Sequence, residues 1–219
     1  MNKRMTMLAG LLSTALLLGG CTTAGTQDNT GSAAQTKPTK TEEVQNIVDA
    51  MSLEEKVAQL FLVQPEAIVD IGTATAAGDA TKQAINKTPV GGFVYFSDNL
   101  QSEQQVQDML RNVQKYSEDR IGLPAFLSVD EEGGTVARVA STGRFDVTDV
   151  GNMADIGASG DVDQAKQAGD TIGTYLSDLG FNLDFAPVAD INTNAENTEI
   201  GNRSFGSEPK TVADMVSQE

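Results

Sequence analysis

Carboxylates, glycines and an arginine lie close together in the segment DEEGGTVAR, which runs from Asp130 to Arg138. Asp130 directly follows an apolar run, so we expect it at the end of a buried strand, where ligands bind in parallel α/β folds. Its carboxylate accepts hydrogen bonds from neighbouring hydroxyl groups, and Arg138 adds a fork of donors. Gly133 and Gly134 permit a turn with positive φ that brings the backbone close to a ligand. The segment therefore predicts a binding site for a ligand that carries hydroxyl groups.

A purely structural interpretation of the same segment stays open. Asp130 would then cap the residues that follow it, and the two glycines would only form a turn. Arg138 would pair with Glu131 or Glu132 at the surface. Residue spacing alone does not decide between the two interpretations.

A second group of charged side chains follows the run GFNLDFAPVAD, residues 180–190. Asp184 and Asp190 have the residue type of a catalytic carboxylate pair. Asp184 falls inside a predicted strand, and Asp190 falls where a carboxylate commonly ties down a loop, so we interpret both as structural. Arg203, in the segment GNRSFG, is the better candidate for ligand binding. It lies in a long loop, where it would hold a ligand hydroxyl or form an ion pair that stabilises the loop.

Apolar runs alternate with helical patterns in the part of the chain that must position these residues. A capping box of Ser52 and Glu55 marks one helix start, and Gly180 marks a helix end. We expect four buried strands, at 60–63, 92–96, 125–130 and 183–187. We expect helices at 41–51, from 52, from 102, at 161–179 and from 208.

Strands separated by amphipathic helices imply an α/β fold with a parallel sheet and right-handed crossovers. The pattern fits an open doubly wound sheet as well as a (β/α)8 barrel. A complete barrel needs about 250 residues, more than residues 41–219 supply. If the fold is a barrel, we therefore expect about its first four β/α units.

The first 21 residues have the pattern of a bacterial lipoprotein signal peptide. Lys3 and Arg4 precede an apolar stretch that is short for a membrane span, and the run LGGC resembles a lipobox that would place a lipid on Cys21. A plain secreted protein with an incidental thiol is the alternative. Residues 22–40 contain no large apolar side chain, so we expect a flexible tether. We therefore expect a secreted protein, anchored by lipid to the outer face of the bacterial cell membrane.

The chain is strongly acidic, with 31 Asp and Glu residues against 15 Lys and Arg residues. Such a surface repels the phosphate backbone of nucleic acids and anionic lipid headgroups. Nucleic acid is therefore not an expected partner, and we expect contact with the membrane through the lipid anchor only.

Five short segments, in order along the chain, resemble successive blocks of the N-terminal domain of family 3 glycoside hydrolases. The resemblance implies a TIM-type barrel over residues 41–219, in which Asp130, Arg138 and Arg203 hold the hydroxyl groups of a terminal sugar. The β-N-acetylhexosaminidase branch is the most similar, which implies hydrolysis of terminal β-linked N-acetylglucosamine from glycans such as peptidoglycan fragments. The five blocks are MSLEEKVAQLF (51–61), GGFVYFSDN (91–99), LPAFLSVDEEGG (123–134), DFAPVAD (184–190) and NRSFG (202–206).

The sequence also departs from the pattern of that family. Glu131 stands where many relatives carry Gln, which adds a charge beside Asp130 and is expected to alter local protonation. The family's KHFPG-type block and its Asp nucleophile lie further along than residue 219, and the sequence contains no His. The implied mechanism is retaining, with that Asp as nucleophile and a loop His assisting proton transfer. We therefore expect a truncated barrel domain that is inactive and poorly folded by itself.

Two other functions stay open. With the same fold, the whole protein would be a β-glucosidase or β-xylosidase. In a different class, it would be a non-catalytic glycan-binding surface lipoprotein, although half a barrel leaves strands near residues 60 and 183 as open edges that promote aggregation. No metal or cofactor is expected, because the sequence has no His, Cys21 would carry the lipid, and retaining hydrolysis needs neither.

Overall fold

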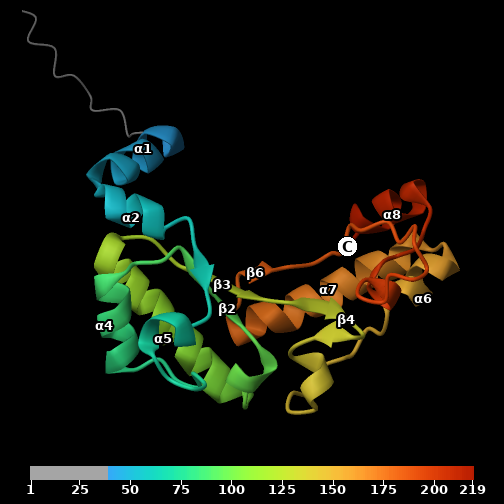
Figure 1. Ribbon diagram of the computed structural model, residues 1–219, viewed down its shortest axis with the longest axis horizontal. Helices are drawn as coiled ribbons and strands as arrows, with labels where there is room; N and C mark the ends of the chain where they lie inside the picture. Colours follow the sequence, from blue (N-terminus) through green and yellow to red (C-terminus); the bar gives the residue numbers. More distant parts are fainter. Residues whose placement is uncertain (1–38) are drawn as a thin grey trace, which may run out of the picture. The chain divides into compact units, whose positions relative to one another are not determined.

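A parallel four-stranded sheet forms the centre of the computed structural model, which describes residues 39–219 (Figure 1). The strands lie in the order β1–β2–β3–β6, so each strand lies beside the next main-sheet strand in the sequence. The register pairs Leu62 with Gly92, Gly92 with Phe126, and Ser128 with Leu183. Parallel strands joined by helices confirm the predicted α/β class. Within the described residues the sheet does not close, and β1 and β6 form its two edges.

The helices alternate with the strands of this sheet, and a short antiparallel hairpin follows β3 directly. The main sheet consists of β1 (Leu62–Val63), β2 (Gly92–Tyr95), β3 (Phe126–Val129) and β6 (Leu183–Asp184), and the hairpin of β4 (Glu131–Gly133) and β5 (Val136–Ala137). The α-helices are α1 (Lys40–Ala50), α2 (Leu53–Ala58), α3 (Glu66–Val69), α4 (Asp79–Lys87), α5 (Glu103–Ile121), α6 (Met153–Ser159), α7 (Val162–Leu179) and α8 (Pro209–Val216). Three 3-10 turns cover Ser97–Asn99, Ala140–Thr142 and Gly201–Arg203.

The helix ends follow the capping signals of the sequence. The predicted capping box at α2 is confirmed: Ser52 Oγ accepts from the Glu55 N–H at 3.2 Å, and the Glu55 carboxylate accepts from the Ser52 N–H at 2.9 Å. Ser102 caps α5, and Gly180 ends α7 with a φ of 99°. Helices α3, α4 and α6 and the β4–β5 hairpin were not predicted from the sequence.

The fourth predicted strand is wrong in extent. It was expected over residues 183–187, but the structure pairs only Leu183 and Asp184 with β3. Pro187 has no N–H to donate to a strand ladder, and the Phe185 N–H makes the last bond to Val129 at 3.0 Å. The chain therefore leaves the sheet early and becomes the long loop that carries Arg203.

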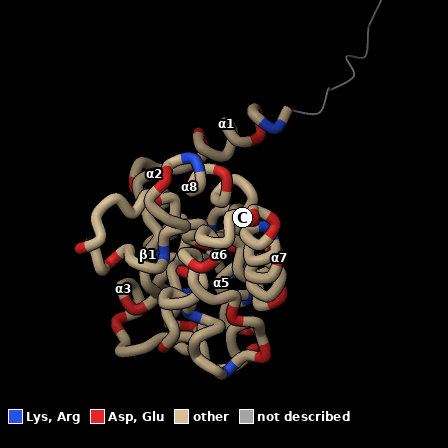
Figure 2. Tube along the Cα trace, turned by 90° about the vertical axis from the view of Figure 1, so that its right-hand side faces the viewer, with Lys and Arg blue, Asp and Glu red and all other residues tan. Residues whose placement is uncertain are grey.

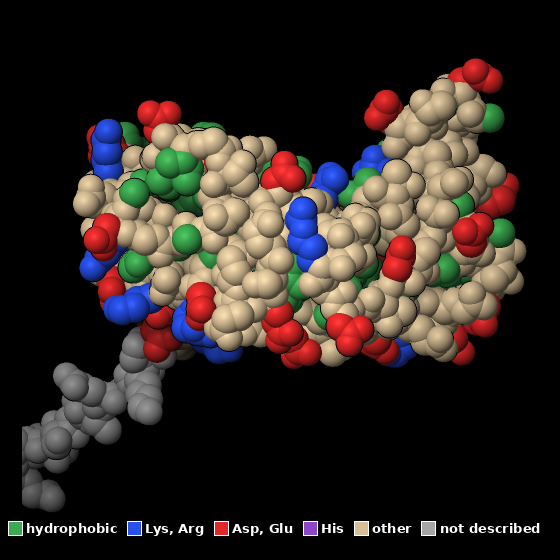
Figure 3. Space-filling model, turned by 90° about the horizontal axis from the view of Figure 1, so that it is seen from below, with side chains coloured by type: hydrophobic (Ala, Val, Ile, Leu, Met, Phe, Trp, Pro, Cys, Tyr) green, Lys and Arg blue, Asp and Glu red, His purple; other side chains and the backbone are tan. Residues whose placement is uncertain are grey.

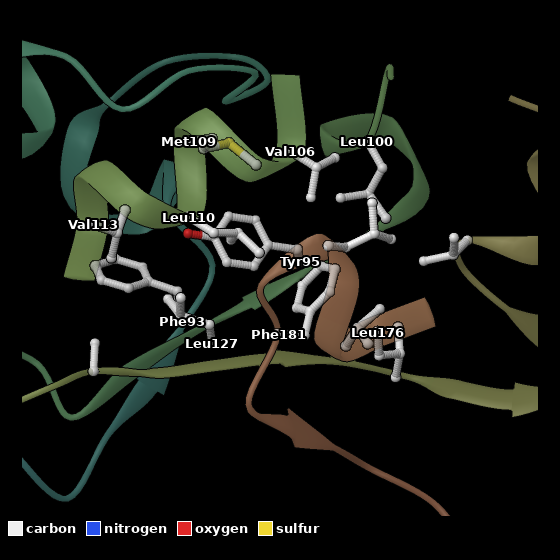
Figure 4. Packing of buried hydrophobic residues seen from close by; sticks show 14 of the residues in the cluster. Phe93, Tyr95, Leu100, Val106, Met109, Leu110, Val113, Leu127, Leu176 and Phe181 are labelled. Atoms are coloured by element: carbon white, nitrogen blue, oxygen red, sulfur yellow. The ribbon is translucent and has the colours of Figure 1, made fainter. Parts of the chain in front are cut away.

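The hydrophobic core lies between one face of the sheet and helices α5 and α7. Phe93 and Tyr95 of β2 and Leu127 of β3 are at most 1% exposed and pack toward α5 (Figure 4). Helix α7 and the residues after it add further buried groups to the same cluster. The other labelled members are Leu100, Val106, Met109, Leu110, Val113, Leu176 and Phe181. This packing fixes the strands in one direction, so their carboxyl ends meet at one edge of the sheet.

Several apolar groups of the described chain are not covered. Helix α1 has the predicted apolar face but buries none of its residues, and Val44 is 60% exposed. Phe126 of β3 is 54% exposed, because it points to the face of the strand opposite to the buried Leu127. Figure 3 shows hydrophobic side chains gathered on its left-hand side, the side on which α4 lies in Figure 1. Acidic residues are spread around the whole trace (Figure 2).

The predicted signal peptide with Cys21 lies outside the described residues, as does the predicted tether up to residue 38. From Lys40 to Glu219 the chain forms one unit. None of the helices between residues 39 and 219 is both long and apolar enough to cross a membrane.

Candidate functional site

Asp130 and Arg138 lie together at the carboxyl end of β3. The hairpin of β4 and β5 folds the chain back, so that the Arg138 N–H donates to the Asp130 carbonyl at 3.3 Å. Their side chains form an ion pair, with 3.4 Å between Arg138 Nη2 and Asp130 Oδ2. Both side chains keep some exposure, 32% for Arg138 and 23% for Asp130. The ion pair is therefore open to a ligand.

The Arg138 guanidinium also stacks against an aromatic ring. Its central carbon lies 5.3 Å from the centroid of Phe96, the residue directly after β2. Such a contact between a cation and a ring is favourable and fixes the plane of the guanidinium. Arg138 Nε is buried and has no hydrogen-bond partner within the described residues. The alternative pairing of Arg138 with Glu131 or Glu132 at the surface is thus wrong, because both glutamates are buried and hold other groups.

Glu131 is fully buried and holds the turn that follows β5. Its carboxylate accepts from the Val139 N–H at 2.7 Å, from the Ala140 N–H at 2.9 Å and from the Tyr175 hydroxyl at 2.8 Å. Burial and the negative charge of Glu131 raise the pKa of Tyr175, so the phenol stays a donor. The expected charge beside Asp130 therefore points inward, and its main consequence is to fix the backbone directly after Arg138.

Glu132 points the other way along the hairpin and binds Arg203. Its two oxygens accept from Arg203 Nε at 2.6 Å and from Nη2 at 2.8 Å, while Nη1 donates to the Glu199 carbonyl at 3.0 Å. The hydrogen bonds to Glu132 raise the pKa of Arg203. Three hydrogen bonds leave this guanidinium with N–H donors to spare. Arg203 therefore forms the loop ion pair that the sequence allowed and can still donate to a ligand.

Asp184, in β6, is half-buried beside the start of the β4–β5 hairpin. Its Oδ1 accepts from the Glu131 N–H at 2.9 Å, which ties β6 to the start of the hairpin. Burial raises the pKa of Asp184 to about 7, and the charges of Glu131 and Asp130 act in the same direction. Asp190 holds the loop through its carbonyl, which accepts from Ser204 Oγ at 2.6 Å. Asp184 thus has the structural contact expected from the sequence, whereas the loop is held by the main-chain carbonyl of Asp190 and not by its carboxylate, which has no hydrogen bond among residues 39–219.

Two glycines allow the hairpin to fit against the residues before α6. Gly133 and Gly134 have φ of 85° and 55°, as predicted for this turn. A Cβ on Gly134 would lie 2.3 Å from Asn152 Oδ1, and one on Gly133 would lie 2.8 Å from the Gly151 carbonyl. Any other residue would therefore strain the backbone and push the hairpin away, and Arg138 with it.

The predicted site residues consequently form two linked pairs. Asp130 with Arg138 presents one carboxylate and one guanidinium at the strand end. Arg203 forms the second pair with Glu132, which is linked to the first because Glu132 follows Asp130 closely in the chain. Asp130 Oδ1 has no partner among residues 39–219 and can accept hydrogen bonds from hydroxyl groups. Adjacent acceptors and donors of this kind bind vicinal hydroxyl groups.

Comparison with protein families supports the resemblance seen in the sequence. Residues 52–219 match the model of the glycosyl hydrolase family 3 N terminal domain. The chain belongs to this family. The match includes all three predicted binding residues and nearly all of the five sequence blocks.

Curated relatives of this family 3 domain are named β-hexosaminidases. The chain is 35% identical over 138 residues to β-hexosaminidase A of Pseudoalteromonas piscicida, a match that covers 61% of this chain and 22% of the relative. It is 40% identical over 91 residues to β-hexosaminidase LpqI of Mycobacterium tuberculosis, covering 41% of this chain and 22% of the relative. The chain thus spans about a fifth of the length of these two relatives.

Solved structures share the fold of this family 3 domain. A glycoside hydrolase family 3 β-N-acetylglucosaminidase from a Paenibacillus species matches with a TM-score of 0.67 and 36% identity, covering 77% of this chain and 30% of that one. The structure of M. tuberculosis LpqI matches with a TM-score of 0.61 and 30% identity, covering 79% of this chain and 45% of that one.

Three residues of this family 3 site were not singled out as functional from the sequence. Phe96 supports the Arg138 guanidinium, Glu132 holds Arg203, and Tyr175 donates to Glu131. Glu131 and Glu132 follow a strand directly, so alternation of side chains would have predicted that they point to opposite sides. No local signal indicates that Tyr175, 44 positions further along, meets Glu131.

Proposed function

We propose that the whole protein to which this chain contributes is a β-N-acetylhexosaminidase that removes terminal β-linked N-acetylglucosamine from glycans, including those of the cell wall. Two relatives that match the chain are named β-hexosaminidases, and a matching solved structure is named a β-N-acetylglucosaminidase. The mechanism we propose is retaining, with a carboxylate nucleophile and a covalent glycosyl intermediate.

The observation that carries this proposal is the Asp130–Arg138 pair at the carboxyl end of β3. Asp130 has a free carboxylate oxygen, and Arg138 is fixed by Phe96 and by the backbone contacts of Glu131. Prearranged groups bind hydroxyls without reorganising, which favours one orientation of the terminal sugar. In this proposal Asp130 accepts from the sugar hydroxyls, and Arg138 and Arg203 donate to them.

We also propose that residues 1–219 do not hydrolyse glycosides by themselves. The site lies beside β6, an open edge of the sheet, so water reaches the bound sugar from that side. The half-buried Asp184 accepts from the Glu131 N–H, and the buried Glu131 and Glu132 hold other groups, so we assign no nucleophile among the described residues.

A chromogenic N-acetyl-β-glucosaminide and the matching β-glucoside, offered to the whole protein, test the function. We expect hydrolysis of the first substrate and release of the β-anomer first, as seen by proton NMR. Asp130→Asn should lower kcat/KM by roughly 10- to 100-fold, the loss expected for one or two hydrogen bonds to a charged group.

Asp119→Asn is the matched control, because Asp119 also pairs with a basic residue, Lys115 at 2.7 Å, but on the exposed surface of α5. It should leave kcat/KM unchanged. Faster hydrolysis of the β-glucoside would show a different specificity, and no hydrolysis of either substrate would contradict the proposed enzyme.

The same assay on cell fractions tests where the enzyme acts. We propose that a lipid on Cys21 holds it at the outer face of the cell membrane, on the basis of the LGGC run in the sequence. The activity should then sediment with membranes and become soluble in Cys21→Ala. Equal sedimentation of both forms would contradict the anchor.

A further inference from the structure

The turn between β2 and α5 supports the Arg138 guanidinium, although it lies in another part of the chain. Phe96 precedes the 3-10 turn Ser97–Asn99, and its ring lies 5.3 Å from the central guanidinium carbon of Arg138. Apart from this ring, the guanidinium has only the 3.4 Å contact with Asp130 among residues 39–219, and its Nε is buried there without a hydrogen-bond partner. The contact of a cation with a ring is effective only at short range. The position of Phe96 therefore determines the position of the guanidinium.

Asn99 holds this turn from the inside. It is 3% exposed, and its Oδ1 accepts from the Phe96 N–H at 2.8 Å. Its Nδ2 donates to Glu66 Oε1 at 2.6 Å and to the Ala74 carbonyl at 3.0 Å. Glu66 Oε1 also accepts from the Ala74 N–H at 2.6 Å. A buried amide with these partners has one favourable orientation, so the inner side of the turn is tied to α3 and to the loop before α4.

Arg144 holds the same turn from the outside. Its Nη1 donates to the Ser97 carbonyl at 2.9 Å and to the Leu100 carbonyl at 2.8 Å. Arg144 follows Arg138 closely in the chain, beyond the 3-10 turn Ala140–Thr142. Two arginines of one short segment thus contact the same turn, Arg138 through the Phe96 ring and Arg144 through the two carbonyls.

The contacts of Arg144 fit a role in positioning better than a role in stabilising the core. Both of its acceptors are neutral carbonyls, and a charged donor makes the stronger kind of hydrogen bond to them. Arg144 is exposed, so water can replace its guanidinium, and its removal should cost little stability. The outer side of the turn would then lose the side chain that holds it, while Asn99 keeps the inner side in place.

We infer that Arg144 is a positioning residue of the Asp130–Arg138 site. It fixes Phe96, and through the Phe96 ring it holds the Arg138 guanidinium in the plane in which Arg138 donates to a sugar hydroxyl. The role in sugar binding rests on the proposed function, whereas the link from Arg144 to Arg138 can be measured without a sugar.

NMR of the whole protein with isotope-labelled arginine tests the link itself. The Nε–H of Arg138 is buried and close to the Phe96 ring, so the ring current should separate its signal from those of exposed arginines. Loss of the signal in Arg138→Lys assigns it. Arg144→Ala should move this signal toward those of the exposed arginines, and Arg144→Lys, which keeps a charged donor, should move it less. The urea midpoint of Arg144→Ala should stay that of the parent.

Calorimetric binding of N-acetylglucosamine measures the consequence for the site. Arg144→Ala should weaken binding by roughly 3- to 10-fold, and Phe96→Ala by at least as much. Combined with Phe96→Ala, Arg144→Ala should weaken binding by less than about twofold further, because its effect passes through the ring. Arg111→Ala is the matched control, since Arg111 is exposed on α5 and pairs with Asp108 at 2.6 Å. It should change neither the Arg138 signal nor the affinity.

The outcomes separate the positioning role from the proposed function. An unchanged Arg138 signal in Arg144→Ala would overturn the positioning role, as would equal losses of affinity with and without the Phe96 ring, and the proposed function would stand in both cases. A shifted Arg138 signal in a protein that binds no sugar would support the link from Arg144 to Arg138 and count against the proposed function.

Discussion

At the end of β3, the alternating direction of successive side chains determines which carboxylate is open to a ligand and which is buried. Asp130 faces the open side with Arg138, whereas Glu131 is fully buried and binds the Val139 and Ala140 backbone. Replacing a buried, hydrogen-bonded carboxylate leaves its donors without partners, whereas Asp130 can exchange Arg138 for a hydroxyl without that loss. Adjacent acids in one motif therefore have opposite roles.

At the residue scale, Asp184 should make stability depend on pH. Burial raises the pKa of Asp184 to about 7 in the folded chain, and the carboxyl titrates near ~4 when unfolded. Between these values the folded state binds more protons, so the free energy of unfolding falls as pH rises from about 4 to about 7. Glu219 acts in the same pH window, because burial also raises its pKa to about 7.

Asp184→Asn removes this titration, and with it the charge that helps to raise the pKa of Glu219, while the amide oxygen can still accept from the Glu131 N–H. Urea unfolding at pH values of about 4.5 and about 7.5 should show a smaller loss of stability in the variant. The difference should be on the order of a few kcal/mol, since one pKa unit corresponds to about 1.4 kcal/mol. Asp214→Asn, in an exposed pair with Lys210, is the control and should follow the parent. Equal losses in Asp184→Asn and the parent would show that Asp184 titrates normally.

At the element scale, the contact of α6 with the Arg203 turn depends on a glycine. A Cβ on Gly157 would lie 1.7 Å from the Phe205 carbonyl, whereas one on Gly173 in α7 would meet nothing within 4 Å. Gly157→Ala should therefore destabilise the chain by about 1–3 kcal/mol through overpacking. Gly173→Ala should stabilise it by up to about 1 kcal/mol through helix propensity. Chemical unfolding of the two variants measures both, and equal changes would contradict the close contact.

The elements also show which parts of the fold are predictable from the sequence. Ser52, Ser102 and Gly180 act within one helical turn, so local patterns predicted these helix ends correctly. Helix α4 was missed because it buries only Thr81 and Ile85, and Ile85 is its single large apolar residue. The predicted strand at 183–187 was too long because its apolar run continues beyond the last pairing partner in β3.

The candidate site was predictable only in part, for a similar reason. Asp130, Arg138 and the two turn glycines lie in one segment, so their proximity follows from the hairpin. The partner of Arg203 is Glu132, 71 positions away, and is set by the packing of whole elements. Sequence spacing therefore indicated that Arg203 is a ligand or ion-pair residue but not which carboxylate it meets.

At the scale of the whole molecule, the described chain buries one face of its sheet and leaves apolar groups on the other. Core residues such as Phe93 and Leu127 are at most 1% exposed, whereas Phe126, on the opposite face of β3, is 54% exposed. Leu60 before β1 and Phe185 after β6 are exposed as well, at 80% and 47%. The edges β1 and β6 also offer unpaired backbone groups. Exposed edges and apolar side chains together favour association between chains.

Residues 40–219 expressed alone should consequently self-associate. Phe61 and Phe126 are each 54% exposed, so Phe61→Ser with Phe126→Ser should increase the monomer fraction in sedimentation velocity and change the free energy of unfolding by less than about 1 kcal/mol. Phe93→Ser with Phe181→Ser replaces the same number of rings inside the core, at 1% and 6% exposure, and should prevent folding. A parent that stays monomeric at high concentration would show that the uncovered face does not drive association. Association that persists unchanged in the exposed double variant would instead assign it to the strand edges, whose backbone groups the substitutions leave in place.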